Sequence, residues 1–259
     1  MKDIVRSQLY QLRKERVIWL VFIGVLLIPF IGILAEGVIN CEGDYPTQTY
    51  LSDMSIISIS GSLMFVFSFT GFVCCGDFGD KTSNYEIMTG HRRIEVYFGR
   101  VIPCLAVGVI CFIIIISAPI IVNTAMHGWG NQLDMGQTLL RYTLLIFPII
   151  RIFCTAIFIS FVVKNAYILM AVGYGAFVLS GIGAVFFKEG KSLFLGLTNI
   201  NMLCMFDSWS TYGLEGNENY IYDASLSAGQ ISGTIIVSLV VSVIFLYLGY
   251  VFFHTDDLN

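Results

Sequence analysis

The stretch Val-Ile-Pro-Cys-Leu-Ala-Val-Gly-Val-Ile-Cys-Phe-Ile-Ile-Ile-Ile-Ser-Ala-Pro-Ile-Ile-Val at residues 101–122 contains no charged side chain. It is long enough to cross a hydrocarbon core of about 30 Å as a helix, which takes about 20 residues. With five similar stretches it makes six predicted spans: 17–35, 54–76, 101–122, 142–163, 166–187 and 229–253. None alternates with the period of two that is typical of a membrane barrel. We therefore predict an all-α membrane protein, with residues 1–259 forming a single transmembrane domain.

The composition of the whole chain agrees with this fold class. Hydrophobic residues make up 56% of the 259 positions and charged residues only 12%, whereas a soluble domain carries about 25% charged residues. The net charge of −4 argues against a nucleic-acid partner, because such proteins neutralise phosphates with basic side chains. We expect the chain to contact membrane lipid and no nucleic acid.

The seven cysteines show no spacing that is typical of a metal site. Five lie inside predicted spans, where they serve as small apolar side chains: Cys74, Cys75, Cys104, Cys111 and Cys154. Cys41 and Cys204 lie outside the spans, and a disulfide between them stays open. The sequence also lacks a phosphate-binding loop and a zinc-protease motif. We expect no catalytic residue, metal or cofactor on this chain.

Lysine and arginine fall mostly on one side of the predicted membrane. They are frequent before the first span and in the loop 77–100, whereas the loop 36–53 has none. Lys164 marks a predicted tight turn between spans four and five on the same side. Basic residues close to the ends of spans tend to stay in the cytoplasm. We therefore predict that both termini and the loop 77–100 are cytoplasmic and that the segment 188–228 is extracellular.

Residues 1–16 are the first of two informative cytoplasmic features. Their apolar side chains fall roughly on one side of a helix: Ile4, Val5, Leu9 and Leu12. Such a segment is either an interfacial elbow helix lying in the membrane surface or the ordinary basic flank of a first span. We favour the elbow helix.

The loop 77–100 is the second feature, and it is longer than the two to eight residues, roughly, that connect neighbouring helices. It predicts a short helix from about Ser83 to Met88, with Glu86 at the capping-box position and Gly90 at the stop. Its mixture of charged and apolar side chains favours a docking element. A solvated connector is the alternative.

These features resemble, in order and spacing, the membrane subunits of type-2 ABC exporters, which include antibiotic, lantibiotic-immunity and polysaccharide exporters. The resemblance rests on Asp80-Lys81-Thr82, on Gly90-His91-Arg92-Arg93-Ile94 and on the tail at 252–258. Lys81 stands where the family usually has a glycine. The resemblance covers nearly the whole chain, and it also implies re-entrant helices between spans five and six.

What the resemblance implies is a permease of the bacterial cell membrane that hydrolyses nothing itself. Two cytoplasmic ATPase subunits would bind ATP and magnesium, and a second permease chain, identical or different, would complete the translocation pathway. The loop would contact the ATPase subunit through Asn84, Tyr85, Glu86, Ile87, Met88, Arg92 and Arg93. The substrate would be an antimicrobial peptide or a drug, which would make the chain part of an antibiotic-resistance exporter.

Arg151 is the one clear charge near the middle of a predicted span. An arginine at that depth costs roughly 2.5–3.5 kcal/mol on insertion scales, so it requires a protein partner or a water-filled path. Either it lies on the translocation path, where it touches a polar or anionic substrate, or it is a structural arginine. The residues alone leave both interpretations open.

Two other classes of membrane protein are alternatives. An ATP-independent secondary transporter or channel typically shows inverted repeats and acidic residues at the midplane, and neither is visible in the sequence. A membrane-embedded enzyme such as a protease needs a catalytic pair at the midplane, but the three histidines, His91, His127 and His254, lie outside the spans.

Overall fold

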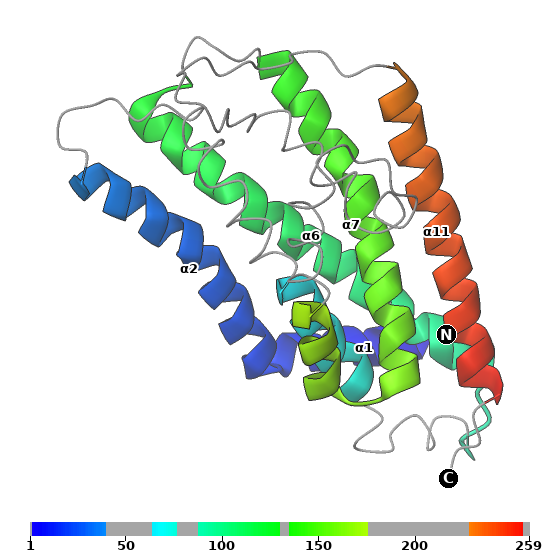
Figure 1. The fold of residues 1–259 in the computed structure, drawn as a ribbon. Coiled ribbons are helices and arrows are strands. Elements are labelled where there is room, and N and C mark those ends of the chain that lie inside the picture. Colours follow the sequence, from blue (N-terminus) through cyan, green and yellow to red (C-terminus); the bar gives the residue numbers. More distant parts are fainter. Residues whose placement is uncertain (1, 40–63, 77–87, 130–134, 176–227, 256–259) are drawn as a thin grey trace.

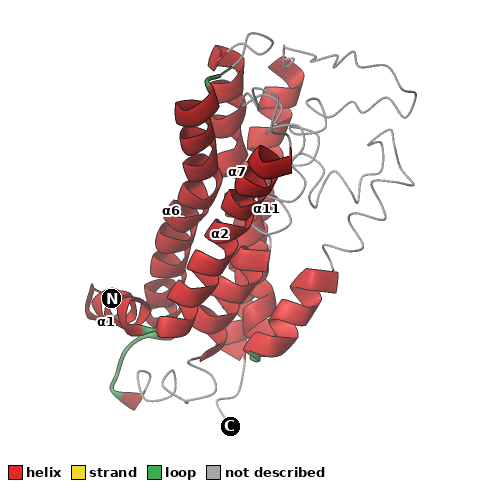
Figure 2. Ribbon diagram, turned by 90° about the vertical axis from the view of Figure 1, so that its left-hand side faces the viewer, coloured by secondary structure: helices red, strands yellow, loops and turns green. Residues whose placement is uncertain are grey.

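A computed structural model describes residues 2–39, 64–76, 88–129, 135–175 and 228–255. Within these ranges the regular elements are all helices. They are α1 (Lys2–Lys14), α2 (Arg16–Ile39), a helix Met64–Cys75 that ends in the π-helical segment η1 (Gly71–Cys75), α6 (Arg93–His127), α7 (Met135–Val163), a helix Ala166–Gly175 and α11 (Ala228–Thr255). The helices α6, α7 and α11 run roughly side by side, and α1 lies across one end of this bundle (Figure 1; Figure 2).

Three helices of the described part are long and apolar enough to cross a membrane: α6, residues Thr143–Val163 of α7, and residues Ile231–Thr255 of α11. They coincide with the third, fourth and sixth predicted spans. The shorter apolar helices Arg16–Leu27, Met64–Cys75 and Ala166–Gly175 fall within or overlap the other three. The segments 40–63 and 176–227, which include the rest of spans two and five and the predicted re-entrant helices, lie outside the described residues.

The helix α11 buries three hydroxyl side chains and exposes many of its large apolar side chains. Thr234, Ser238 and Ser242 follow each other at intervals of four and are all buried. The exposed side chains include Ile236, Leu239, Val240, Val243, Ile244 and Tyr247. A surface helix of a water-soluble protein shows the opposite pattern. The distribution is compatible with a membrane protein, whose outer surface faces hydrocarbon.

The core lies where α6 and α7 meet the helix Met64–Cys75. The ring centroids of Phe65 and Phe69 are 5.4 Å apart, and that of Phe153 on α7 is 6.3 Å from Phe69. A Cβ atom at Gly108 of α6 would lie only 2.5 Å from the Phe153 ring. Small residues let membrane helices approach closely, and Gly108 provides the space for this ring.

A two-residue turn joins α7 to the helix Ala166–Gly175. Lys164 has a left-handed backbone, with φ of 56°, and the side-chain oxygen of Asn165 accepts a hydrogen bond from the amide of Tyr167 at 2.9 Å. A side-chain oxygen in this place is a helix N-cap. The tight turn predicted at Lys164 is therefore confirmed.

Candidate functional site

The candidate site is the basal end of the bundle, which we define as the region where α1, the start of α6 and the end of α11 meet (Figure 1). The described part of the predicted docking loop begins here, at residue 88. The side chain of Met88 is 81% exposed, and that of Arg92 is also exposed. The other predicted contact residues in the loop lie outside the described residues: Asn84, Tyr85, Glu86 and Ile87.

A short, well-defined connection leads from Met88 into α6. Gly90 has φ of 95°, a conformation that favours glycine and agrees with the predicted stop there. Arg92 is the extended N-cap of α6, and its carbonyl oxygen accepts hydrogen bonds from the amides of Glu95 and Val96 at 2.9 Å and 3.2 Å. Only Thr89 to His91 therefore separate the exposed Met88 from the capping residue of a membrane-length helix.

Arg93, the first residue of α6, reaches the end of α11. Its Nη1 donates a hydrogen bond to the carbonyl oxygen of His254, the last residue but one of that helix. The final carbonyls of a helix lack partners within the helix and carry a partial negative charge, so a guanidinium group stabilises them. Arg93 thus joins two helix ends, and its predicted contact with an ATPase subunit stays a prediction.

One turn further along α6, Tyr97 makes a second connection to α11. Its hydroxyl donates a hydrogen bond to the carbonyl oxygen of Leu246 at 2.8 Å. Its ring is fully buried, with centroids 5.8 Å from Tyr250, 6.0 Å from Phe253 and 4.9 Å from Phe161. Tyr97 was not among the predicted site residues. Aromatic residues near the ends of both helices were the available signal.

The helix α1 packs across the start of α6. Ile4, Gln8 and Leu12 form its buried stripe, and a Cβ atom at Gly99 would lie 2.7 Å from Cγ2 of Ile4. Leu9, which we expected on the apolar side, is 44% exposed. Leu9 is rotated by about 100° from the 4-8-12 stripe, which is the side that faces α6, so the apolar side chains of α1 divide between this packed stripe and the exposed surface.

The angle between α1 and α2 is held by a side chain. Trp19 Nε1 donates a hydrogen bond to the carbonyl oxygen of Leu12 at 3.1 Å, near the end of α1. The predicted N-terminal helix is therefore a separate element that turns away from α2, as an elbow would.

Arg151 lies near the middle of α7 and is 1% exposed. The neighbouring α11 presents its buried hydroxyl groups, among them Ser238 and Ser242, to the bundle interior. Arg151 is thus buried within the described part of a single chain, and both of its interpretations stay predictions.

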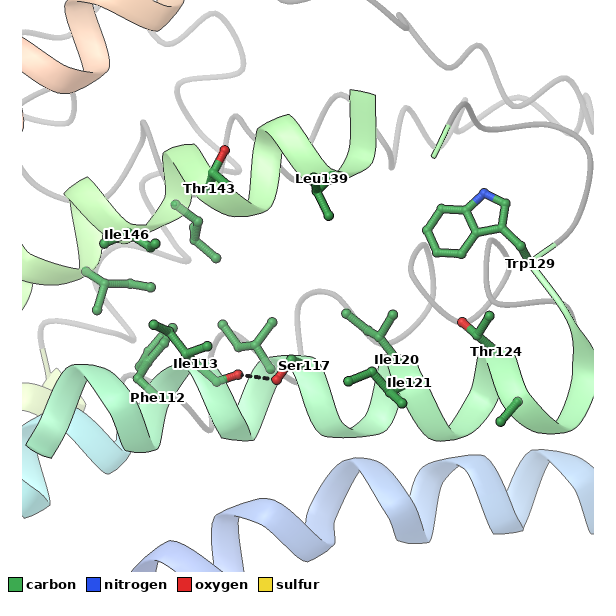
Figure 3. Close-up of a pocket in the computed structure, with 14 residues that line it drawn as sticks. Phe112, Ile113, Ser117, Ile120, Ile121, Thr124, Trp129, Leu139, Thr143 and Ile146 are labelled. Carbon is green, nitrogen blue, oxygen red and sulfur yellow. Dashed lines mark hydrogen bonds between the residues drawn. The ribbon is translucent and has the colours of Figure 1, made fainter. Parts of the chain in front are cut away.

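An apolar groove of about 580 Å³ lies between α6 and α7, toward the end of the bundle away from α1. Figure 3 shows its walls, with Trp129 at one end. The hydroxyls of Ser117 and Thr143 turn back to their own helices, donating hydrogen bonds to the carbonyl oxygens of Ile113 at 2.7 Å and Leu140 at 2.8 Å. The lining residues include no ionisable side chain, so this groove offers shape and apolar contact without groups for acid–base chemistry.

The cysteines of the described part, which are the five predicted inside spans, are all buried and free. Cys41 and Cys204 lie outside the described residues. Among the residues that the structure describes, no group of three or more His, Cys, Asp or Glu side chains could hold a metal ion.

Comparison with known proteins adds no relative. No protein-family model matches the chain, and no curated protein matches it either. The resemblance to type-2 ABC exporters therefore rests on the residues of this sequence.

Proposed function

We propose that this chain is the membrane permease subunit of an ATP-driven exporter, spanning a bacterial cell membrane six times with both termini in the cytoplasm. Three helices of membrane length and three shorter apolar helices, in the order of the six predicted spans, support this proposal. In this proposal span five continues to residue 187, and the segment 188–228 is extracellular and carries re-entrant helices before α11.

The packing and hydrogen bonding of the helices at the basal end are the main support for this proposal. A transporter driven by a separate motor needs an exposed docking element that is rigidly joined to its membrane helices. Met88 is exposed, and a short connection leads from it to α6. The start of α6 is in turn packed against α1 through Gly99 and bonded to α11 through Arg93 and Tyr97.

The motor in this proposal is a pair of cytoplasmic ATPase subunits, which bind ATP and magnesium. They contact residues 84–88 and Arg92 of each permease chain. Two permease chains, identical or different, enclose the pathway, and the exported substrate is an antimicrobial peptide or a drug. Arg151 stays inside each chain and supports the fold.

Purification of the tagged chain from its native membrane tests the proposal. We expect a copurifying subunit that carries a phosphate-binding loop and hydrolyses ATP. The double variant Tyr85→Ala/Met88→Ala should lose that subunit. Met126→Ala is the matched control, because Met126 is also exposed but lies at the opposite end of α6.

ATP-independent transport by the purified chain in proteoliposomes would overturn the proposal. It would favour a secondary transporter or channel instead. Retention of the ATPase subunit by the double variant would refute the contact at residues 85 and 88 while leaving the function in place.

A further inference from the structure

We infer that Arg93 and Tyr97 form a latch that transmits movement of the docking loop to the end of α11. The latch consists of these two side chains and the part of α11 that they hold, Leu246 to His254. The inference rests on the proposed function, because it assigns a mechanical role to the segment that the ATPase subunit would contact.

Two bonds fix the position of α11 relative to α6. Arg93 holds the carbonyl of His254, and Tyr97 holds the carbonyl of Leu246. The two donors are one turn apart on α6, and the two acceptors are about two turns apart on α11. A single bond would act as a pivot. Two bonds at different heights oppose both rotation and sliding of one helix past the other.

The packing around Tyr97 makes the connection rigid. Its ring is enclosed by Phe161 of α7 and by Tyr250 and Phe253 of α11. Gly249 lets the phenol approach, since a Cβ atom there would lie 2.6 Å from the hydroxyl oxygen. Movement of the first turn of α6 must therefore carry the last turns of α11 with it.

The same geometry indicates which residues would transmit a force to the latch and which surface would move in response. The exposed residues Met88 and Arg92 lie five positions and one position before Arg93, so a force on the loop reaches the latch through a few residues. At the other end, α11 carries an exposed apolar face that includes Val243 and Tyr247. This face would shift against lipid or a second permease chain when the latch moves.

Hydrogen–deuterium exchange of the permease–ATPase complex in lipid nanodiscs tests the latch. In the wild type we expect a non-hydrolysable ATP analogue to change the exchange of residues 246–254. In Tyr97→Phe, which keeps the ring, exchange there should become about two- to tenfold faster, and the response to nucleotide should shrink. The double variant Arg93→Gln/Tyr97→Phe should lose the response. Because Arg93 is also a predicted ATPase contact, this variant is compared only if the ATPase subunit still copurifies with it, and otherwise Tyr97→Phe decides.

Tyr247→Phe is the matched control, because it makes the same chemical change on the exposed face of the same helix. It should behave as the wild type. A nucleotide response of undiminished size in both Tyr97→Phe and the double variant would overturn the latch and leave the proposed function intact. If the double variant does not fold, the single variant still decides. Absence of any ATPase subunit from the wild type would overturn both the proposed function and the latch.

Discussion

Replacing Gly249 with alanine tests how closely α6 and α11 approach each other. A Cβ atom at this position would lie 2.6 Å from the hydroxyl oxygen of Tyr97 and 3.7 Å from the Cα of Phe158. The first distance is too short for two atoms that are not bonded. The phenol therefore has to move, and its hydrogen bond to the carbonyl of Leu246 is lost.

The structure sets the size and the sign of the effect. An added methyl group in a packed core costs about 1–3 kcal/mol, and the better helix propensity of alanine offsets up to about 1 kcal/mol. Gly249→Ala should thus lower the free energy of unfolding by about 1–2 kcal/mol. Tyr97→Phe alone removes one hydrogen bond and costs about 1 kcal/mol.

The double variant Gly249→Ala/Tyr97→Phe separates the loss of this contact from a general destabilisation of the helix. Without the hydroxyl, the nearest atom to the new Cβ is the ring carbon Cζ at 3.6 Å, an ordinary contact. The loss of unfolding free energy in the double variant should therefore be about 1–2 kcal/mol smaller than the sum of the losses in the two single variants. Reversible unfolding in mild detergent, followed by circular dichroism, measures all three variants.

Gly233→Ala is the control on the same helix, since a Cβ there would meet nothing within 4 Å. It should leave the free energy of unfolding unchanged or slightly higher. Strict additivity of the Gly249 and Tyr97 changes, or a Gly249→Ala variant as stable as Gly233→Ala, would refute the described contact between the helices.

Three further substitutions have expected outcomes. Gly99→Ala should push Ile4 away from α6 and expose α1, which limited proteolysis detects as faster cleavage, and a second change Ile4→Ala should reverse much of it. Asn165→Ala should cost about 1 kcal/mol through the lost N-cap, whereas Asn165→Asp should be neutral in thermal unfolding. Arg151→Ala should lower stability by about 3 kcal/mol, because it leaves a cavity in place of a large, fully buried side chain. Transport per folded molecule should persist; its complete loss with unchanged stability would place Arg151 on the translocation path instead.

Much of the helix layout could be predicted from the sequence because the signals are local. An uncharged run of membrane length can satisfy its backbone in hydrocarbon only as a helix, and the stretch 101–122 lies within α6 as expected. The stop at Gly90 and the turn at Lys164 were also visible, since each depends on the conformational freedom or charge of a few adjacent residues.

The buried face of α1 could not be predicted from the local sequence pattern. Hydrophobicity alone placed Leu9 on the apolar side, but the structure buries Gln8 and exposes Leu9. The partner surface decides this choice: Gly99 leaves room on α6 for Ile4, and the residues four and eight positions later follow on the same stripe.

The sequence by itself determined that the chain forms long apolar helices and where several of them begin and end. Only the tertiary structure brought Arg93 to His254 and Tyr97 to Leu246, pairs that are 161 and 149 positions apart. The sequence of α11 is apolar on nearly every side, so its pattern could not indicate which face packs inward. Contact with α7 and α6 decided it, since the face turned toward them carries the buried hydroxyl groups, a pattern compatible with a helix whose outer face meets hydrocarbon.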